Sequence, residues 1–398
     1  MSNPDFKSRA KDIEDVVVSW RRHFHSHPEL SFEEVETSKY IASELGKMGC
    51  ENIRIGTFGR PTGVLADIVG AFPGKRVALR ADIDALPVSE ETGLEFASKN
   101  KGIMHACGHD AHIAMLLGAA KMLCEVKDEL HGSVRLIFQP SEESAAFKQG
   151  AVAVVEDGLA LAGVDAIFGA HVMSGLSAGK LGYNKGPMMA CSDTWKINIT
   201  GKGGHGASPH ETHDPMTAAG QLICALQTFV SRELDPIKSA VLSIGIVKAG
   251  SAFNIIPAEV EMIGTARSFE KQVSYDTEAF IRRMAENICA AFRCKAEVKY
   301  RRNLPPTVNT PKMALLGAEA ARGVFGDENV IEAEPNMAGE DFSWYLEKVP
   351  GAYFFIGAGN EDKGAVWPHH HCRFTIDEDV LYKGSALEAS CAWKFLNG

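Results

Sequence analysis

The sequence predicts a two-domain α/β protein in which a small α+β domain interrupts a larger α/β domain with a mixed sheet. Short buried strands alternate with helices in the first and last parts of the chain, which favours a largely parallel sheet. The middle part instead contains strands with the alternation of a half-exposed sheet. The 398 residues, 45% of them hydrophobic, suffice for more than one core. We expect the larger domain over residues 1–188 and 305–398 and the inserted domain over residues 189–304.

The larger domain is expected to begin with helices and to continue with buried strands. The helices are expected over residues 8–22, 31–48 and 113–127. Ser31, followed by Glu34 three residues later, has the pattern of a capping box for the second of these helices. The buried strands are expected over residues 76–81, 133–138, 165–170 and 353–356.

Polar side chains follow three of these strands. Asp82 and Asp84 follow the first strand, Glu142 and Glu143 follow the second, and His171 follows the third. Ligands of parallel α/β sheets bind at the carboxyl ends of the strands. Each residue alone is unremarkable, because strand ends are often polar, but together they predict one polar site along one edge of the sheet.

The inserted domain is expected to have the order strand, helix, strand, strand, helix, strand. Asp214 and Pro215 have the pattern of a helix start, with Asp as the cap and Pro in the first turn. The expected strands cover 194–200, 240–248, 259–267 and 296–300, and the expected helices cover 215–232 and 271–292. This order is a split βαβ unit.

The stretch Met104–His112 is the first candidate metal site. Cys107 and His109 are separated only by Gly108, which allows the sharp turn that would bring both side chains to one point. Thiolate and imidazole suit zinc, manganese, cobalt or nickel. Asp110 is a candidate for orienting a ligating imidazole. The alternative is a loop with a free cysteine and helix-capping residues.

The adjacent carboxylates Glu142 and Glu143 suggest a division of labour near a metal, in which one binds the ion and the other takes a proton from water. The alternative is a solvated acidic loop. The histidines at 369–371 are either a surface loop or the source of a further ligand. One of them would complete a five-ligand set, enough for two metals, with Cys107, His109, Glu143 and His171.

Three residues of the inserted domain are candidates for contact with a substrate. His205 lies among glycines, as at the tip of a lid that stabilises an oxyanion; the alternative is a mobile surface turn. Arg267 and Asn254 have the chemistry to hold a substrate carboxylate. From spacing alone, either could equally be an ordinary surface residue.

Composition excludes several classes of protein. The net charge is −10 without a basic tract, so nucleic acid is not an expected partner. No apolar run approaches the roughly 18 residues of a membrane span, and the N-terminus lacks a signal-peptide pattern. Nine scattered cysteines favour a reduced, cytoplasmic protein. The absence of a paired CxxC excludes a zinc finger.

Motifs along nearly the whole chain carry a family resemblance. In order they are RRHFHSHPELSFEE, ALRADIDALPVSEETG, MHACGHDAH, FQPSEE, GAHV, GKGGHGASPH, NIIPAEVEMIGTARSF, GEDF and HHHCRFTIDED. The chain resembles the amidohydrolase branch of the di-metal aminoacylase and carboxypeptidase superfamily. That branch includes hippurate hydrolases, N-acyl-amino-acid amidohydrolases and auxin-conjugate hydrolases. The resemblance implies a phosphorylase/hydrolase-like catalytic domain and a ferredoxin-like lid and dimerisation domain.

The resemblance also implies roles for individual residues. Glu142 matches the general base, His205 the lid histidine at the scissile carbonyl, and Arg267 and Asn254 the substrate contacts. In the family, the last ligand stands two positions before a proline that is followed by an arginine or similar residue and an aromatic residue. Cys372-Arg373-Phe374 occupies these positions here, with Cys372 in place of the proline, which puts the ligand at His370. Ser144-Ala145 stands where many members carry glycines. The implied metal ligands are Cys107, His109, Glu143, His171 and His370.

The activity that follows from the resemblance is hydrolysis of an N-acyl amino acid to a carboxylic acid and a free amino acid. Two divalent ions per chain (Mn, Zn, Co or Ni) and a homodimer or higher homo-oligomer are implied. One alternative is a dipeptidase or carboxypeptidase on the same scaffold. The other is a non-catalytic metal-binding protein, against which the intact Glu142 argues.

Overall fold

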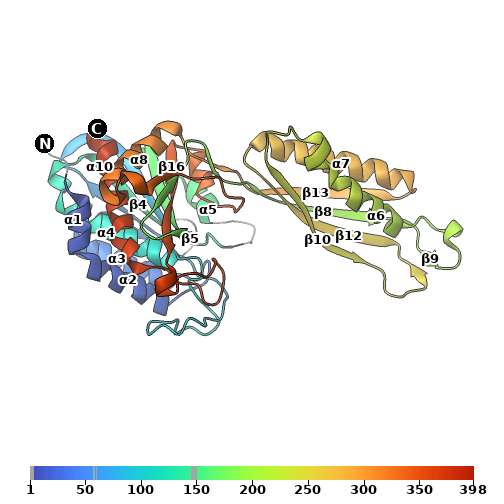
Figure 1. The fold of residues 1–398 in the computed structure, drawn as a ribbon, viewed down its shortest axis with the longest axis horizontal. Helices are drawn as coiled ribbons and strands as arrows, with labels where there is room; N and C mark the ends of the chain where they lie inside the picture. The colour runs from blue at the N-terminus through green and yellow to red at the C-terminus, as the bar shows by residue number, and fades with distance from the viewer. Residues whose placement is uncertain (1–3, 57–58, 60, 145–149) are drawn as a thin grey trace. The chain divides into compact units, whose positions relative to one another are not determined.

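Figure 1 shows the computed structural model of the chain, which describes residues 4–56, 59, 61–144 and 150–398. The chain forms two compact units. Unit 1 consists of Met1–Met188, Val308–Glu334 and Asp341–Gly398, and unit 2 consists of Met189–Thr307 and Pro335–Glu340. The short segment Pro335–Glu340 thus belongs with unit 2, although it follows residue 305 in the sequence.

Unit 1 is built on a mixed sheet of eight strands among its described residues. The strands are β1 (Glu51–Ile55), β2 (Val64–Val69), β3 (Phe72–Asp82), β4 (His131–Gln139), β5 (Ala166–Ser177), β6 (Leu181–Tyr183), β15 (Val330–Glu332) and β16 (Gly351–Gly359). Their order is β1-β2-β4-β3-β5-β16-β6-β15. The central strands β4, β3, β5 and β16 are parallel. Strands β2 and β6 pair antiparallel with this central group, β1 pairs antiparallel with β2, and β15 pairs parallel with β6. The predicted mixed sheet is confirmed.

Helices cover this sheet. They are α1 (Phe6–Asp12), α2 (Glu14–Ser26), α3 (Val35–Met48), α4 (His109–Glu125), α5 (Gly150–Asp157), α8 (Pro311–Phe325), α9 (Ser343–Leu346) and α10 (Leu381–Asn397). Helices α4 and α10 pack against each other and against β3 (Figure 1). Nearly every residue from His109 to Leu123 is buried, because α4 lies between the sheet and the outer helices. Within the described chain, we find no helix with both the length and the apolar surface needed to cross a membrane.

The structure corrects three expectations in unit 1. The first expected helix is two helices, α1 and α2, which meet at Ile13. Helix α3 begins at Val35 and not at Ser31, because Phe32 adopts a left-handed φ of 68° and the Ser31 hydroxyl donates to Asp84. The capping-box interpretation is therefore wrong. Strand β5 continues to Ser177, so His171 lies within the strand and not after its end.

Unit 2 contains an antiparallel sheet with the order β10-β12-β8-β13. Its strands are β8 (Ser192–Thr200), β10 (Ala240–Ala249), β12 (Glu259–Ser268) and β13 (Lys295–Leu304), and its long helices are α6 (Pro215–Leu226) and α7 (Lys271–Ala291). The chain order is the predicted split βαβ order. Alternate residues of β8, among them Trp195 and Ile197, pack into a core shared with both helices. A small ribbon of β9 (Gly204–His205) and β11 (Ile255–Ile256) extends this unit.

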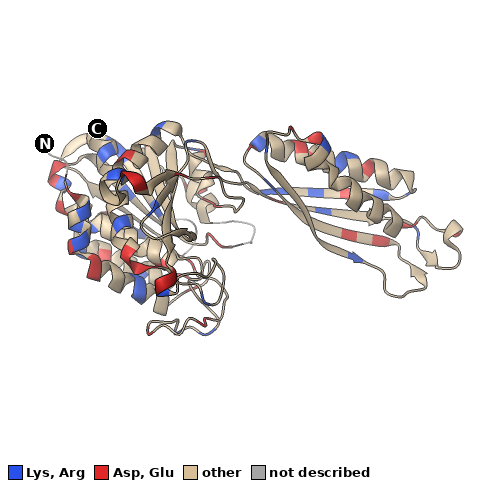
Figure 2. Ribbon diagram, viewed as in Figure 1, with Lys and Arg blue, Asp and Glu red and all other residues tan. Residues whose placement is uncertain are grey.

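Acidic and basic residues are interspersed along the helices and strands of each unit (Figure 2). This distribution agrees with the net charge of −10 without a basic tract. Neither unit, in its described part, concentrates its lysines and arginines in one long element.

Candidate metal centre

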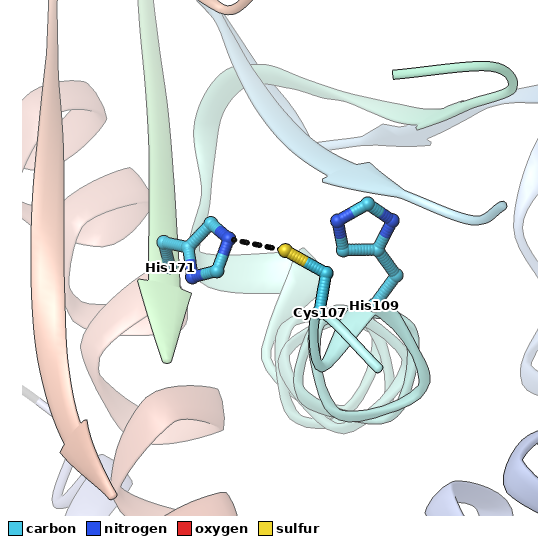
Figure 3. A group of neighbouring side chains, drawn as sticks. All are labelled: Cys107, His109 and His171. Atoms are coloured by element: carbon cyan, nitrogen blue, oxygen red, sulfur yellow. Dashed lines mark hydrogen bonds between the residues drawn. The ribbon is translucent and has the colours of Figure 1, made fainter. Parts of the chain in front are cut away.

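Three side chains from separate parts of unit 1 converge at the carboxyl edge of the sheet. Cys107 precedes α4, His109 is the first residue of α4, and His171 lies on β5 (Figure 3). One ligand atom from each lies within 4.8 Å of the others. The Cys107 Sγ atom is 3.5 Å from His171 Nε2. All three residues are buried.

The turn between Cys107 and His109 depends on Gly108. Its φ of 90° is in the left-handed region, which glycine adopts without strain. A Cβ atom at this position would lie 2.5 Å from Val172 Cγ2. The close approach of β5 and the start of α4 therefore requires glycine here, and it places both side chains at the same point.

A second group of three donors overlaps the first. One atom each of Cys107, Glu143 and His370 also lie within 4.8 Å of one another. The His370 Nε2 atom is 3.2 Å from Glu143 Oε1, and His109 Nε2 is 3.9 Å from the same oxygen. Because Cys107 belongs to both groups, the donors form two adjacent sets that share one sulfur atom. This arrangement has the donors that two neighbouring cations need.

The three histidines at 369–371 point in different directions. His369 donates from Nε2 to the carbonyl oxygen of Val172 at 2.8 Å. His371 stacks on Trp367, with ring centroids 4.3 Å apart. Among the three, His370 is the one whose ring nitrogen faces Glu143.

Asp84 holds the imidazole of His109. The Nδ1 atom of His109 donates to the Asp84 carbonyl oxygen at 2.9 Å and lies 3.2 Å from Asp84 Oδ1. The Nε2 atom is left buried without a hydrogen-bond partner. Asp84 Oδ2 also accepts the backbone N–H of Glu143 at 3.0 Å. Asp84 therefore aligns one candidate ligand from each side of the site.

Asp110 does not have the role that we expected for it. Its Oδ2 atom accepts from Arg21 Nε and from His25 Nδ1, both at 2.8 Å. It therefore anchors α2 to the start of α4 and does not orient a candidate ligand. In the sequence Asp84 was noted only as a polar residue just after a strand, and its spacing did not indicate that it would orient His109.

Charge and burial at the site favour a bound cation. Burial and the carboxylates of Glu143 and Glu142 raise the pKa of the Cys107 thiol well above its ordinary value. Burial opposes protonation of His109, but Asp82, Asp84 and Glu143 outweigh it and raise its pKa to about 10. A thiolate in this acidic surrounding needs a positive charge beside it. A metal ion held by His109, whose Nε2 is buried without a hydrogen-bond partner, would supply that charge.

The donor set fits borderline divalent metals. His171 donates from Nδ1 to the carbonyl of Val172 at 2.7 Å, which leaves the Nε2 lone pair facing Cys107. Burial and the neighbouring His112 and His369 lower its pKa well below the ordinary value, so the imidazole is neutral. With a divalent ion in place of their protons, the Cys107 thiolate and the imidazoles, together with the carboxylate, would suit zinc, manganese, cobalt or nickel better than calcium or magnesium.

Glu142 lies beside these donors. One of its carboxylate oxygens is within 4.8 Å of ligand atoms of His109 and Glu143. Its Oε1 atom accepts the backbone N–H of Asp341 at 3.4 Å. The preceding Ser141 has a φ of 60°, a conformation that side chains rarely adopt, and its N–H donates to buried Glu34 at 2.8 Å. The turn that carries both glutamates is thus held from two sides. Of Ser144 and Ala145, which stand where many family members carry glycines, Ala145 lies outside the described residues.

Comparison with known proteins decides the family. Residues 78–394 match the model of Peptidase family M20/M25/M40. The chain belongs to this family. It is similar to Thermostable carboxypeptidase 1 of Saccharolobus solfataricus (44% identity over 392 residues, 98% of each chain) and to N-acetyl-L-cysteine deacetylase of Bacillus subtilis (46% over 386 residues, 97% of this chain and 89% of the relative).

The solved structure of a dinuclear metal binding peptidase of the M20 family from Bacillus subtilis is similar, with a TM-score of 0.85 and 41% identity. The match covers 97% of this chain and 99% of that structure. The family and the fold class expected from the sequence are confirmed. This M20 chain is a hydrolase.

The candidate substrate contacts of unit 2 lie at two ends of its sheet. His205 is exposed on β9, where its Nδ1 accepts the N–H of Ala207 at 3.0 Å. Asn254 lies beside it, since its carbonyl oxygen accepts the N–H of Gly206 at 2.8 Å. Arg267 lies near the far end of β12 and donates to the carbonyl oxygen of Ala266 at 3.0 Å.

The separation of these residues follows from the strand register. The end of β8 at Thr200, shortly before His205, pairs with Glu259 at the start of β12. Arg267 is eight residues further along β12, a distance of roughly 26 Å at about 3.3 Å per residue. Unit 2 therefore brings His205 and Asn254 together and keeps Arg267 apart from both.

Proposed function

We propose that this M20 hydrolase cleaves the amide bond of N-acyl amino acids and releases a carboxylic acid and a free amino acid. The observation that carries the proposal is the pair of donor sets that share Cys107, with Glu142 beside them. The relative named N-acetyl-L-cysteine deacetylase, 46% identical, supports an acyl amino acid as the substrate class.

Five residues would hold two divalent ions of manganese, zinc, cobalt or nickel, namely Cys107, His109, Glu143, His171 and His370. Bound ions of this kind supply Lewis acidity, which acidifies a water molecule and polarises the substrate carbonyl. Asp84 accepts from Nδ1 of His109, so that Nε2 faces the other candidate ligands, and it holds the backbone of Glu143. The protein thus orients these side chains before any ion binds.

Glu142 is the proposed general base. It removes a proton from the attacking water and returns that proton to the nitrogen of the leaving amino acid. The N–H of Asp341, whose nitrogen lies 3.4 Å from Oε1, helps to hold this carboxylate in place. His205 is proposed to donate to the oxyanion of the tetrahedral intermediate.

Arg267 and Asn254 are the proposed contacts of the substrate carboxylate. Because roughly 26 Å of β12 separates Arg267 from the end of the sheet that leads to His205, one copy of unit 2 cannot present both to one small substrate. The homodimer implied by the family resemblance resolves this conflict, since His205 of one copy would then serve the site of the other. An exposed β10 at the edge of the unit 2 sheet offers a surface for such pairing.

A peptidase function is the second candidate. The relative named Thermostable carboxypeptidase 1 is 44% identical over nearly the whole chain, so the acyl half of the substrate would then be a peptide. The proposed base and ligands serve either reaction. The difference lies in whether the acyl pocket accepts a free α-amine.

The test is hydrolysis by metal-stripped protein re-supplied separately with Mn²⁺, Zn²⁺, Co²⁺ or Ni²⁺. The substrates are N-acetyl, N-benzoyl and indole-acyl amino acids beside free dipeptides. Glu142→Gln should abolish turnover but keep the bound metal, whereas the neighbouring Glu143→Gln should lose metal as well. Faster cleavage of free dipeptides would favour the peptidase candidate. Turnover that survives in Glu142→Gln would refute the proposed base.

A further inference from the structure

Two cysteines of unit 1 outside the metal centre face each other. The Sγ atoms of Cys50 and Cys124 are 3.6 Å apart. Cys50 follows Gly49, which ends α3 in a left-handed conformation with a φ of 81°, and Cys124 lies in the last turn of α4. Helices α3 and α4 pack together in unit 1 (Figure 1). Both cysteines are half-buried, so a small reagent can reach them from solvent.

We propose that Cys50 and Cys124 form a reversible disulfide that joins the C-terminal ends of α3 and α4. The sulfur atoms of a disulfide lie about 2.05 Å apart, so these two need to approach by roughly 1.5 Å. Rotation about the Cα–Cβ bonds moves a sulfur atom by that distance without a shift of the helices. All nine cysteines of the chain carry free thiols in the structure, which therefore shows the reduced form.

The surroundings favour Cys124 as the attacking thiol. Either thiol can donate in the hydrogen bond between the two sulfurs. That hydrogen bond and the positive charges of Lys127 and Lys121 lower the pKa of Cys124, against the opposing effects of burial and Glu125. The thiolate is the nucleophile in disulfide exchange, so the first bond is expected at Cys124.

The oxidant is a small-molecule disulfide of the glutathione type. The Cys124 thiolate attacks one of its sulfurs, forms a mixed disulfide and releases one small thiolate, which takes up a proton. The Cys50 thiol then loses its proton to solvent and attacks the Cys124 sulfur, which releases the second small thiol. Two protein thiols are oxidised, and one small disulfide is reduced to two thiols.

The cross-link would act on stability and leave the metal centre alone. Cys124 lies 15 residues after His109 on α4, about 22 Å along the helix axis. The closed loop spans a sequence separation of 74 residues and contains β1, β2, β3 and the candidate ligands Cys107 and His109. Closing such a loop restricts the unfolded chain, so the oxidised protein should unfold at a higher temperature.

The test uses the full-length, metal-loaded protein in buffers of oxidised and reduced glutathione. Peptide mapping by mass spectrometry without reduction should find a peptide that joins Cys50 to Cys124, and dithiothreitol should remove it. The Tm of the oxidised protein should rise by several degrees. Cys124→Ser and Cys50→Ser should each lose the linked peptide and the rise in Tm, whereas Cys224→Ser, a change at an exposed cysteine of unit 2, should retain both.

Two results would overturn the proposal. The first is glutathione adducts on Cys50 or Cys124 without the linked peptide, or no modification of either residue. The second is a linked peptide that forms only after urea has unfolded the protein. If Cys124→Ser fails to fold, Cys50→Ser, which changes a turn residue and not a helical one, decides the outcome alone.

Discussion

A buried arginine behind the metal centre offers the sharpest test of how unit 1 is held together. Arg80 of β3 lies 2.6 Å from a carboxylate oxygen of Asp82 through Nη1 and 2.6 Å from one of Asp341 through Nη2. Asp341 also accepts from the Gln139 side chain at 2.8 Å and from the N–H of Ala151 at 3.0 Å. Arg80 and both aspartates are buried.

We predict that Asp341→Ala strongly destabilises unit 1. Removing one partner from a buried ion-pair network costs about 3–5 kcal/mol. Without Asp341, the buried Arg80 keeps Asp82 as its counter-charge but loses the second one, and the Gln139 side chain and the N–H of Ala151 lose their buried acceptor. That is a large share of the roughly 5–15 kcal/mol by which folded proteins are stable. The variant keeps the backbone N–H of residue 341, which donates to the Glu142 carboxylate. The lost side chain, however, helps to hold that N–H in place. Amide hydrolysis should therefore fall even where unit 1 remains folded.

The assay is native-state hydrogen exchange, because it reads the two units separately. Peptides from β3 and β4 should show an opening free energy lowered by about 3–5 kcal/mol, while peptides from β8 and β12 should not change. Glu319→Ala is the matched control, since it removes a carboxylate from an exposed pair with Lys394 and should leave the opening free energy of unit 1 nearly unchanged. A loss below about 1 kcal/mol in unit 1 for Asp341→Ala, or an equal loss in both units, would refute the reasoning.

Three further predictions concern pH, metal and substrate. Burial and Asp84 raise the pKa of Glu34 from 4.5 to about 8, so the folded protein holds this proton more tightly than the unfolded one. This contribution to the free energy of unfolding is fully present below pH 4.5 and is lost as the pH rises to about 8. In Glu34→Gln, the urea midpoint of unfolding should no longer fall over this pH range; an unchanged pH dependence of the midpoint would contradict the prediction. His370→Ala should lower the metal content measured by mass spectrometry, whereas His371→Ala should leave it unchanged; equal contents would exclude His370 as a ligand. Arg267→Lys should raise KM about 10–100-fold, through the lost bidentate contact, with little change in kcat; an unchanged KM would remove Arg267 from the substrate site.

Several features of this protein could be predicted from the sequence because they depend on short spacing. Gly108 between Cys107 and His109 allows little but a sharp turn with both side chains on one side. Adjacent Glu142 and Glu143 after a strand must lie together at its carboxyl end. The order of unit 2 followed from strands and helices with their own periodicity, and the motifs in sequence order were enough for the family.

Other features depend on packing between distant segments, which spacing does not reveal. The family frame already suggested His370 among three consecutive histidines, but only the structure shows that its ring faces Glu143, more than 200 residues earlier in the chain. The sequence suggested Asp110 as the residue that orients an imidazole, whereas the return of α4 onto β3 gives this place to Asp84. The 3.6 Å between Cys50 and Cys124 likewise exists only because α3 packs on α4.

The sequence by itself thus determined the family, the order of the elements and the residue types at the site. The tertiary structure alone decided which of several chemically equivalent side chains meet. The physical reason is that local backbone geometry is set by a few neighbouring residues, whereas contact between distant side chains depends on how the sheet and helices of the whole unit pack.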